Sequence, residues 1–544
     1  MHRSVLRAAV LAALTLSASA QTTVVEEGRL QAPLAGAWTN GGSAVAFSAG
    51  RLASGAPSTS APGRAFTYTT NAGLWQLDAS ADALDGASND RFGKSIALDA
   101  DTLLVGAPGS GDLFGNGPGA AYLFTRTGGT WTQVQKFTPA VPKSQGLFGA
   151  AVALDGTTLA IGAPQIDVST MGQVVVYVKS GASWVHQQTL IPSGLNPGAR
   201  AGTSVALEGN RLVVGAPNQI VNSIAQVGRA FVFERTGSTW SQVAVIESPT
   251  PSATGTFGAA VALDGGRIAV AATREPYPNA FHRRVHLFTG GGASWSLEQT
   301  LTGTNTATQN CRFGASLALE GSRLLVGAPG HNNPNVLFAG TVKLFETSGS
   351  SWVETLDIQG SGAVFNALLG ESVALAGDLV LGGAPGLGAN AGGNSAYVWR
   401  LNPANPATYC TAKVASPGCL AAIGWSGTPS ASSAAPFLVT ATQVVSQKFG
   451  ILIHGPLYNQ APFFSGVLCI GSPITRTSVQ NSGGSASGSD CSGSFAFDFN
   501  AYVQGGGAGG LGAGDWVWAQ YWFRDPLGSQ GVGLSNGLRF RIQP

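Results

Sequence analysis

Residues 313–329, FGASLALEGSRLLVGAP, contain the pattern that decides the fold. The aromatic-Gly pair Phe313-Gly314 opens this stretch, and a Gly-Ala-Pro triplet begins fourteen residues after the first position of the pair. The same spacing recurs in five more copies and in a worn seventh copy that comes first in the chain. The triplets begin at residues 55, 106, 162, 215, 271, 327 and 383, so the period is 51 to 56 residues. A fixed period of this length is typical of stacked supersecondary units.

Some copies have lost the aromatic residue or part of the triplet but keep the spacing. The pairs and triplets are Gly41-Gly42 with Gly55-Ala56-Pro57, Phe92-Gly93 with Gly106-Ala107-Pro108, Phe148-Gly149 with Gly162-Ala163-Pro164, Ala201-Gly202 with Gly215-Ala216-Pro217, Phe257-Gly258 with Ala271-Ala272-Thr273, Phe313-Gly314 with Gly327-Ala328-Pro329, and Leu369-Gly370 with Gly383-Ala384-Pro385.

Each copy is predicted to form four strands. From Phe313 to Glu320, bulky and small residues alternate with period two, which indicates a strand with one bulky and one small face. A turn at Glu320-Gly321, a second strand over 323–326, a third over 341–345 and a fourth over 352–358 follow. Four strands in each of seven copies predict a seven-bladed β-propeller, so we expect an all-β fold.

The last copy lacks its own fourth strand, because Asn402-Pro403-Ala404 ends it. Residues 22–30 precede the first copy and are expected to supply the missing strand, closing the ring and removing its exposed edges. A frayed tail is the alternative. The expected organisation is a signal peptide over 1–20, a propeller over 21–402 and a β-sandwich over 403–544.

The first twenty residues have the features of a secretory signal. Arg3 and Arg7 give a positive start, an apolar stretch follows over 8–16, and Ala18-Ser19-Ala20 forms a small-residue cleavage site. An uncleaved signal anchor is the alternative. We expect export and a secreted or cell-surface location.

The repeated residues resemble the FG-GAP repeats of the integrin α-subunit propeller and of related bacterial exported proteins. The resemblance rests on the Phe-Gly pair, the Gly-Ala-Pro triplet and the tryptophan that opens the fourth strand, over residues 22–402. It implies a seven-bladed propeller whose commonest role is adhesion or ligand recognition.

Calcium binding is not carried over from that resemblance. Calcium-binding copies have an Asp-rich loop between the pair and the triplet, whereas this chain has two-residue turns such as Asp155-Gly156 and Glu320-Gly321. One carboxylate on a short turn cannot supply six to eight oxygen ligands. The best remaining metal candidate is the group Asp82, Asp85, Asn89 and Asp90, whose spacing matches no known cage and which solvated loop carboxylates also explain. We expect no metal and no cofactor.

The fifth copy departs most from the pattern and supplies the candidate ligand-binding residues. Aromatic residues beside arginine are favoured at binding hot spots, and arginine grips carboxylates or sulfates with two parallel hydrogen bonds. An ordinary solvated loop is the alternative. The candidates in the fifth copy and in the matching loop of the next are Arg274, Tyr277, His282, Arg283, Arg284 and His331.

The composition and motifs argue against several classes of protein. Charged residues make up only 10% of the chain and the net charge is +2, without a basic run, which argues against nucleic-acid binding. No His-Glu-x-x-His motif occurs, and no catalytic residue is predicted. We expect a binding or adhesion protein, not an enzyme, that recognises an extracellular protein or glycan through loops on one propeller face. The alternatives are a polysaccharide-active enzyme with its site at the propeller mouth and a structural spacer of the cell envelope.

The last quarter contains four of the five cysteines and is expected to hold two disulfides. Cys410, Cys419, Cys469 and Cys491 allow three pairings, of which the short loops favour 410–419 with 469–491. Zinc is the rival explanation, but no Cys-x-x-Cys spacing supports it.

Short alternating strands in this region suggest a β-sandwich. Trp516, Trp518 and Trp522 share one face of a predicted strand over 515–523. They form either part of a core or a platform on which sugars stack.

Overall fold

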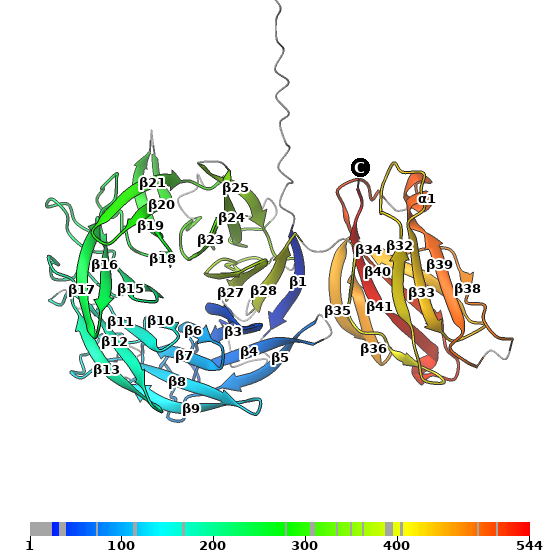
Figure 1. Ribbon diagram of the computed structural model, residues 1–544, viewed down its shortest axis with the longest axis horizontal. Helices are drawn as coiled ribbons and strands as arrows, with labels where there is room; N and C mark the ends of the chain where they lie inside the picture. The colour runs from blue at the N-terminus through cyan, green and yellow to red at the C-terminus, as the bar shows by residue number, and fades with distance from the viewer. Residues whose placement is uncertain are drawn as a thin grey trace, which may run out of the picture.

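The computed structural model describes residues 24–31, 40–71, 74–111, 117–165, 169–277, 280–304, 311–332, 336–348, 351–361, 364–386, 395–402, 406–486, 489–507 and 510–543. Seven four-stranded antiparallel sheets stand around a ring, and a second domain lies beside it (Figure 1). The predicted all-β class and seven-bladed propeller are confirmed. The predicted signal peptide over 1–20 lies outside the described residues.

The first six sheets follow the chain order from the inner strand to the outer strand. The first three blades are β2 (Ala44–Ser48), β3 (Arg51–Ala56), β4 (Arg64–Asn71) and β5 (Leu74–Ala81); β6 (Ser95–Asp99), β7 (Thr102–Ala107), β8 (Ala120–Thr127) and β9 (Thr130–Phe137); and β10 (Ala151–Asp155), β11 (Thr158–Ala163), β12 (Gln173–Ser180) and β13 (Ser183–Leu190). The next three are β14 (Ser204–Glu208), β15 (Arg211–Ala216), β16 (Arg229–Thr236) and β17 (Thr239–Ile246); β18 (Val261–Asp264), β19 (Arg267–Tyr277), β20 (Ala280–Gly291) and β21 (Ser294–Leu301); and β22 (Leu317–Glu320), β23 (Arg323–Ala328), β24 (Thr341–Ser348) and β25 (Ser351–Ile358).

The N-terminal strand completes the seventh blade. That blade contains β26 (Ser372–Ala376), β27 (Leu379–Ala384) and β28 (Ser395–Leu401). Its outer strand is β1 (Val24–Gln31), which pairs antiparallel with β28 from Val24 opposite Leu401 to Gln31 opposite Ser395. The ring therefore closes through the pairing of β1, from the start of the repeat region, with β28, from its end.

Neighbouring blades meet backbone to backbone where the triplet glycine of one blade touches the pair glycine of the next. A Cβ atom on Gly106 would lie 2.1 Å from the carbonyl oxygen of Gly149, and one on Gly327 would lie 2.0 Å from that of Gly370. The pair glycines also have φ near +90°, which side chains disfavour. Both glycines of the repeated pattern are thus required by the packing between blades.

The fifth copy loosens this contact. Ala271 replaces the triplet glycine, and a Cβ on Gly314 would meet the Cβ of Ala271 at 3.0 Å before any backbone oxygen. Four other blades add a hydrogen bond here, because the serine two positions after the pair glycine donates to the pair-glycine carbonyl of the next blade. These serines are Ser95, Ser204, Ser316 and Ser372, at 2.8, 2.8, 2.8 and 2.9 Å.

The C-terminal domain is a sandwich of two sheets with two small hairpins. One sheet has the order β29-β41-β40-β34-β37, with β38 also on β34, and the other has the order β32-β33-β39. Its strands are β29 (Ala407–Tyr409), β30 (Val414–Ala415), β31 (Cys419–Leu420), β32 (Ala422–Ser426), β33 (Leu438–Val444), β34 (Phe449–Gly455), β35 (Leu457–Phe463), β36 (Gly466–Gly471), β37 (Thr475–Arg476), β38 (Gln480–Asn481), β39 (Gly493–Asp498), β40 (Trp516–Arg524) and β41 (Val532–Arg541).

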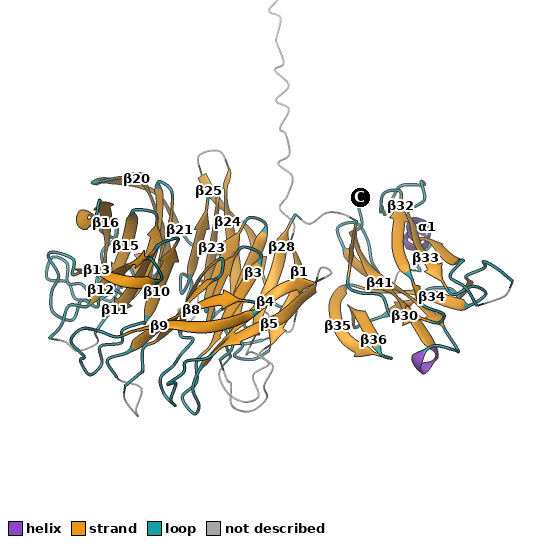
Figure 2. Ribbon diagram, turned by 60° about the horizontal axis from the view of Figure 1, so that its bottom comes forward, coloured by secondary structure: helices purple, strands orange, loops and turns teal. Residues whose placement is uncertain are grey.

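Figure 2 shows that the two short helices also belong to this domain. They are α1 (Phe499–Gln504) and the 3-10 turn η1 (Ser529–Gly531). The strand before α1 ends at Asp498, because the Asp498 side chain accepts a hydrogen bond from the N–H of Ala501 and caps α1.

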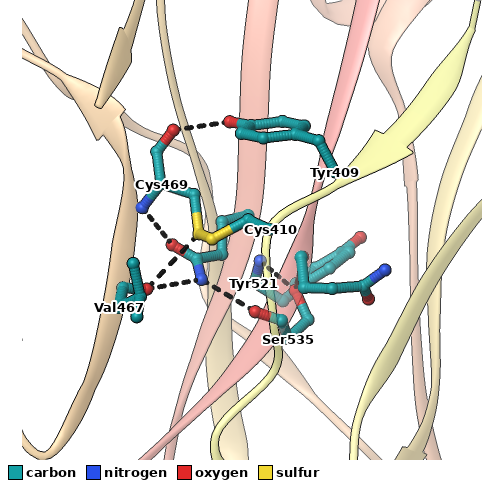
Figure 3. The surroundings of a disulfide bond; sticks show 8 residues. Tyr409, Cys410, Val467, Cys469, Tyr521 and Ser535 are labelled. Carbon is teal, nitrogen blue, oxygen red and sulfur yellow. Dashed lines mark hydrogen bonds between the residues drawn. A yellow bond between two sulfur atoms is a disulfide. The ribbon is translucent and has the colours of Figure 1, made fainter. Parts of the chain in front are cut away.

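The four cysteines form two disulfides, but the expected pairing is wrong. Cys410 bonds to Cys469 and Cys419 to Cys491, with sequence separations of 59 and 72 residues. The β29 segment lies beside the β36 hairpin, where the Tyr409 hydroxyl donates to the carbonyl of Cys469 at 2.6 Å (Figure 3). The packing of separate strands brings together cysteines that are far apart in the sequence, so loop length did not decide the pairing.

The three tryptophans of β40 lie against other residues of the molecule. Trp518 is 7% exposed and packs with Val25, Tyr409 and Cys410, while Trp516 and Trp522 pack at the edge of the same cluster. Packing in a core therefore explains this face, and no open platform of three rings is present among the described residues.

A charged contact joins this domain to the closing strand of the ring. Glu27 of β1 accepts from Arg400 of β28 at 2.7 Å and lies 3.2 Å from Arg539 of β41.

Candidate functional site

Chain direction divides the connections of the ring between two faces. Each inner strand starts at its aromatic-Gly pair and ends at the short acidic turn, and each second strand returns to end at the triplet. The residue after the triplet donates its N–H to a carbonyl just before the pair of the same blade, as Gly109 does to Asp90 and Gly330 to Cys311, both at 3.0 Å. The segments around the pairs and triplets therefore lie on one face, here named the mouth face.

A tight turn brings two residues of every copy to the mouth. These flanking residues are the one just before the pair and the one just after it. In all seven copies the N–H of the second donates to the carbonyl of the first at 3.0 to 3.3 Å, as Lys94 does to Arg91. The first has positive φ in every copy, between 48° and 82°, although none of the seven is glycine. This strained conformation is repeated because the turn connects the outer strand of one blade to the inner strand of the next.

Positive charge is concentrated among the flanking residues. The residues before the pairs are Asn40, Arg91, Leu147, Arg200, Thr256, Arg312 and Leu368, and those after the pairs are Ser43, Lys94, Ala150, Thr203, Ala259, Ala315 and Glu371. They include four cations and one carboxylate, whereas lysine and arginine together number 29 in a chain of 544.

Flanking residues of four blades line a cavity of about 380 Å³ at the mouth. Its charged residues are Arg91, Lys94, Arg312 and Glu371, and Asn40 and Ser43 add polar groups. Arg312 binds Glu371 through both terminal nitrogens, at 2.8 and 3.3 Å. Among the described residues, the side chains of half-buried Arg91 and exposed Lys94 have no ion-pair partner. The cavity therefore offers two uncompensated cations to a ligand.

The fifth-copy candidates lie on a long hairpin beside this mouth. β19 and β20 have 11 and 12 residues, and the hairpin pairs Glu275 with His282 and Tyr277 with Ala280. The side chains of Arg274, Tyr277 and His282 lie outside the described part of the structure. The hairpin reaches beyond the triplet position, as the departure of this copy from the pattern suggested.

The two neighbouring arginines of this hairpin are half-buried. Burial lowers the pKa of Arg283, and the nearby positive charge of Arg312 acts in the same direction. Arg284 donates to the hydroxyl of Thr250 at 3.4 Å. Arg283 therefore adds to the positive field of the mouth, while Arg284 contacts the connection from blade 4 to blade 5.

His331, predicted as a ligand-binding residue, is buried in the structure. It is 5% exposed, and its backbone is fixed by bonds to Ala328 and Gly340, both at 3.0 Å. The loop after the triplet folds inward at this position, so the imidazole is covered.

Sequence reasoning missed Arg91, Lys94 and Arg312, which do line the mouth. The signal was present in the repeat: aligning the copies on the aromatic-Gly pair places Arg91, Arg200 and Arg312 at one position. That position becomes meaningful only when the ring brings blades 6, 7, 1 and 2 around one cavity.

The acidic turns on the opposite face hold the blades together. The carboxylates of Asp99, Glu208 and Glu320 accept from the backbone N–H of Gly156, Gly265 and Gly377 of the next blade, at 2.8, 2.8 and 2.7 Å. Asp155 and Asp264 make the equivalent bonds to Gly209 and Gly321. These carboxylates therefore satisfy turn donors, which is a structural role.

The carboxylates of the candidate metal site near the second blade also have partners within the protein. Asp82 pairs with Arg64 and Asp85 with Lys136, both at 2.5 Å, and Asp90 accepts from the N–H of Ala87 at 2.9 Å. No group of three or more His, Cys, Asp or Glu side chains suited to a metal ion occurs among the described residues.

A larger groove of about 710 Å³ lies where the connection from blade 2 to blade 3 and the loop after the third-copy triplet meet β12 and β13. Val141, Tyr177, His186 and Ile191 are among its lining residues. No Asp or Glu lines it within the described ranges.

Comparison with known proteins supports the repeat. A family model described as "FG-GAP repeat" matches residues 75–124, 131–178 and 184–233. The chain contains FG-GAP repeats. Each match starts at the tryptophan of one blade and ends in the third strand of the next, so the FG-GAP unit is offset from the structural blade by one strand.

The other comparisons add little. A search of curated proteins finds no match. Among solved structures, a chain of "Crystal Structure of Mitotic Checkpoint Complex" is similar over 72% of this chain and 99% of that chain, with 14% identity and a TM-score of 0.43. A likeness this weak bears on neither the details of the fold nor the function.

The two disulfides fit an oxidising compartment. No helix among the described residues is long and apolar enough to cross a membrane.

Proposed function

We propose that this chain is an exported, non-enzymatic binding or adhesion protein whose FG-GAP propeller holds an acidic extracellular ligand at its mouth. The carrying observation is the cavity lined by Arg91, Lys94 and Arg312, in which two cations lack a carboxylate partner among the described residues. Arginine and lysine at a concave site favour carboxylate or sulfate groups through charge-assisted hydrogen bonds. A glycan bearing uronic acid or sulfate, or an acidic protein segment, supplies such groups.

The chemistry at the mouth supports binding over catalysis. Glu371 is the carboxylate that lines the cavity, and Arg312 holds it in a two-pronged ion pair. General acid–base work needs a group that is free to exchange protons beside the substrate. The fifth-copy hairpin widens the recognition surface, since Arg283 lies within the field of Arg312.

If the protein were only a structural spacer, no concentration of charged residues at the mouth would be expected. Four cations at fourteen flanking positions in a chain with a net charge of +2 favour a ligand site instead. Export is supported by the predicted signal sequence and the disulfides.

The test is a binding array of sulfated, uronic-acid-bearing and neutral glycans together with matrix proteins. The wild-type chain is compared with an Arg91→Ala/Lys94→Ala variant, and Arg283→Ala and Arg284→Ala variants test the fifth-copy hairpin. We expect binding to acidic members that the Arg91/Lys94 variant loses. Equal binding by that variant would exclude the mouth as the site.

A matched control is available on the opposite face. Arg323 binds Glu346 at 3.0 Å and the carbonyl of Gly377 at 2.9 Å, so Arg323→Ala removes one cation without touching the mouth. It should retain ligand binding. If Arg323→Ala weakened ligand binding as much as the Arg91→Ala/Lys94→Ala variant does, the loss of binding would be explained by the change in net charge and not by the mouth.

A further inference from the structure

In each blade, two residues lie directly opposite each other at an equivalent position on the two outer strands. Blade 6 has a different combination of residue types at this position from the other blades. In six blades this pair joins the third strand to the fourth, and in the seventh it joins β28 to β1. The pairs are Phe66 with Ser80, Tyr122 with Lys136, Val175 with Thr189, Phe231 with Val245, His286 with Thr300, Lys343 with Asp357 and Tyr397 with Arg29. Only in blade 6 does this pair combine a lysine with a carboxylate.

The lysine of this pair is completely buried. Lys343 has 0% of its side chain exposed. Its Nζ lies 2.9 Å from Oδ2 of Asp357, 2.8 Å from Oε1 of Glu354 and 3.2 Å from Oγ1 of Thr304. Alternation along β24 puts it on the same face as Phe345, which packs with Cys311 and Phe313. A buried amine therefore meets a directly opposed carboxyl group and a second carboxyl group whose side chains are 26% and 12% exposed.

Both carboxyl groups are held in fixed orientations. The hydroxyl of Thr341 donates to Oδ1 of Asp357, which leaves Oδ2 facing the amine. Glu354 accepts from the N–H and the hydroxyl of Thr304, at 2.7 and 2.6 Å. The reacting atoms thus need little reorganisation to meet.

The contact between Glu354 and the backbone does not require a carboxylate. At the same place in blades 2 and 4, the side-chain oxygens of Gln133 and Gln242 accept from the N–H groups of Leu84 and Ser193, at 3.0 and 2.8 Å. Glutamine therefore suffices for the structural task. In blade 6, where the buried lysine is present, the amide is replaced by an acid that can exchange protons.

We propose that Lys343 and Asp357 become joined by an intrachain amide (isopeptide) bond, with Glu354 moving the protons. The Nζ atom of Lys343 attacks Cγ of Asp357, the C–N bond forms, and the bond from Cγ to Oδ2 breaks. Of the three protons on the ammonium nitrogen, one stays on the amide and two leave with Oδ2 as water, carried by Glu354. An ammonium and a carboxylate give an amide and water, so no oxidant, cofactor or co-reactant is needed.

The surroundings favour the neutral product. Lys343 is fully buried while the side chain of Asp357 is 26% exposed; a buried ammonium is costly to keep even when it is paired, and an amide carries no net charge. The bond would tie β24 to β25 across the outer hairpin of blade 6, beside Thr304 in the connection from blade 5. It would complement the two disulfides, which lie in the other domain.

Intact mass spectrometry of the full-length chain tests this directly. The wild type is expected to be lighter, by the mass of one water, than its sequence with two disulfides. A tryptic digest should contain one branched peptide that carries both Lys343 and Asp357. Lys343→Arg and Asp357→Ala variants should show their full calculated masses. A wild-type chain at its full calculated mass would overturn the proposal and leave an ion pair.

Glu354→Gln is the matched control for the chemistry. Glutamine keeps the bond to the Thr304 N–H, as Gln133 and Gln242 show in their own blades, so this variant should fold. It is expected to remain at full calculated mass under conditions in which the wild type has lost water. A cross-linked Glu354→Gln chain would overturn the role assigned to Glu354.

Discussion

The two faces of the ring use the same residue types for different purposes. On the face opposite the mouth, Arg211 and Arg323 each bind a carboxylate of their own blade and the carbonyl of the turn glycine in the next blade. At the mouth, Arg91 and Lys94 line a cavity without such partners among the described residues. Where a charge and its partner recur together with the repeat, they hold blades together. Where a charge occurs in only some copies and lacks a partner, it is available to a ligand.

The largest expected effect is a loss of stability when a glycine at the mouth end of a blade is replaced. Gly106→Val would put side-chain atoms into the carbonyl of Gly149, because even a Cβ would lie 2.1 Å from it. We expect a loss of about 3 kcal/mol or more in the free energy of unfolding, since rigid backbone cannot yield. Chemical denaturation measures it.

Gly156→Ala is the matched glycine on the opposite face. A Cβ there meets nothing within 4 Å, and φ is +54°. Only the backbone strain of the left-handed region remains, which costs about 1 kcal/mol. Equal losses at Gly106 and Gly156 would show that contact between blades is not what requires the triplet glycine.

The next largest effect is on ligand binding. Replacing Arg91 and Lys94 with alanine should weaken binding of the acidic array ligand by at least about tenfold, since each charge-assisted hydrogen bond contributes about 1.5–3 kcal/mol. The free energy of unfolding should change little, because neither side chain has an ion-pair partner among the described residues. Titration calorimetry and denaturation should be run on the same samples. A stability loss without a binding loss would reverse the roles assigned to the two faces.

A smaller effect is expected from the acidic turns. Glu320→Ala removes the acceptor that Gly377 N–H uses at 2.7 Å, on an exposed turn. The expected loss is about 0.5–1 kcal/mol of stability, typical of one solvent-accessible hydrogen bond. Ligand binding should be unchanged. Weaker ligand binding in this variant would place part of the site on the wrong face.

The smallest effect is expected from calcium. The turn carboxylates accept backbone N–H bonds across the blades, and a single carboxylate per turn gives too few ligands for calcium. Calorimetric titration of the purified chain with calcium should give no saturable heat. Tight stoichiometric binding would overturn the metal-free interpretation of these repeats.

The repeat spacing predicted most of the architecture, because the strands of each blade are specified by residues within one repeat. The pair glycine, the triplet glycine and the alternation between them specify the strands and the contact with the next blade. The four cysteines were also found from the sequence, but their pairing was not. Cys410 and Cys469 meet because β29 lies beside the β36 hairpin, a contact that loop length does not report.

The candidate site was predicted less well. The unusual fifth copy drew attention to Arg283 and His331, yet the first lies half-buried at the edge of the mouth and the second is covered. Arg91, Lys94 and Arg312 lie in copies that keep the pattern and so attracted no notice. Their importance arises from neighbours in other blades.

The sequence alone therefore determined the strand order and the blade number, because each depends on residues within one period or on the same residues one period later. Tertiary structure decided which charges remain unpartnered among the described residues, which cysteines bond, and that the buried Lys343 meets Asp357 and Glu354. Ring closure and strand register set distances between residues that no periodicity connects, and charge, burial and reactivity depend on those distances.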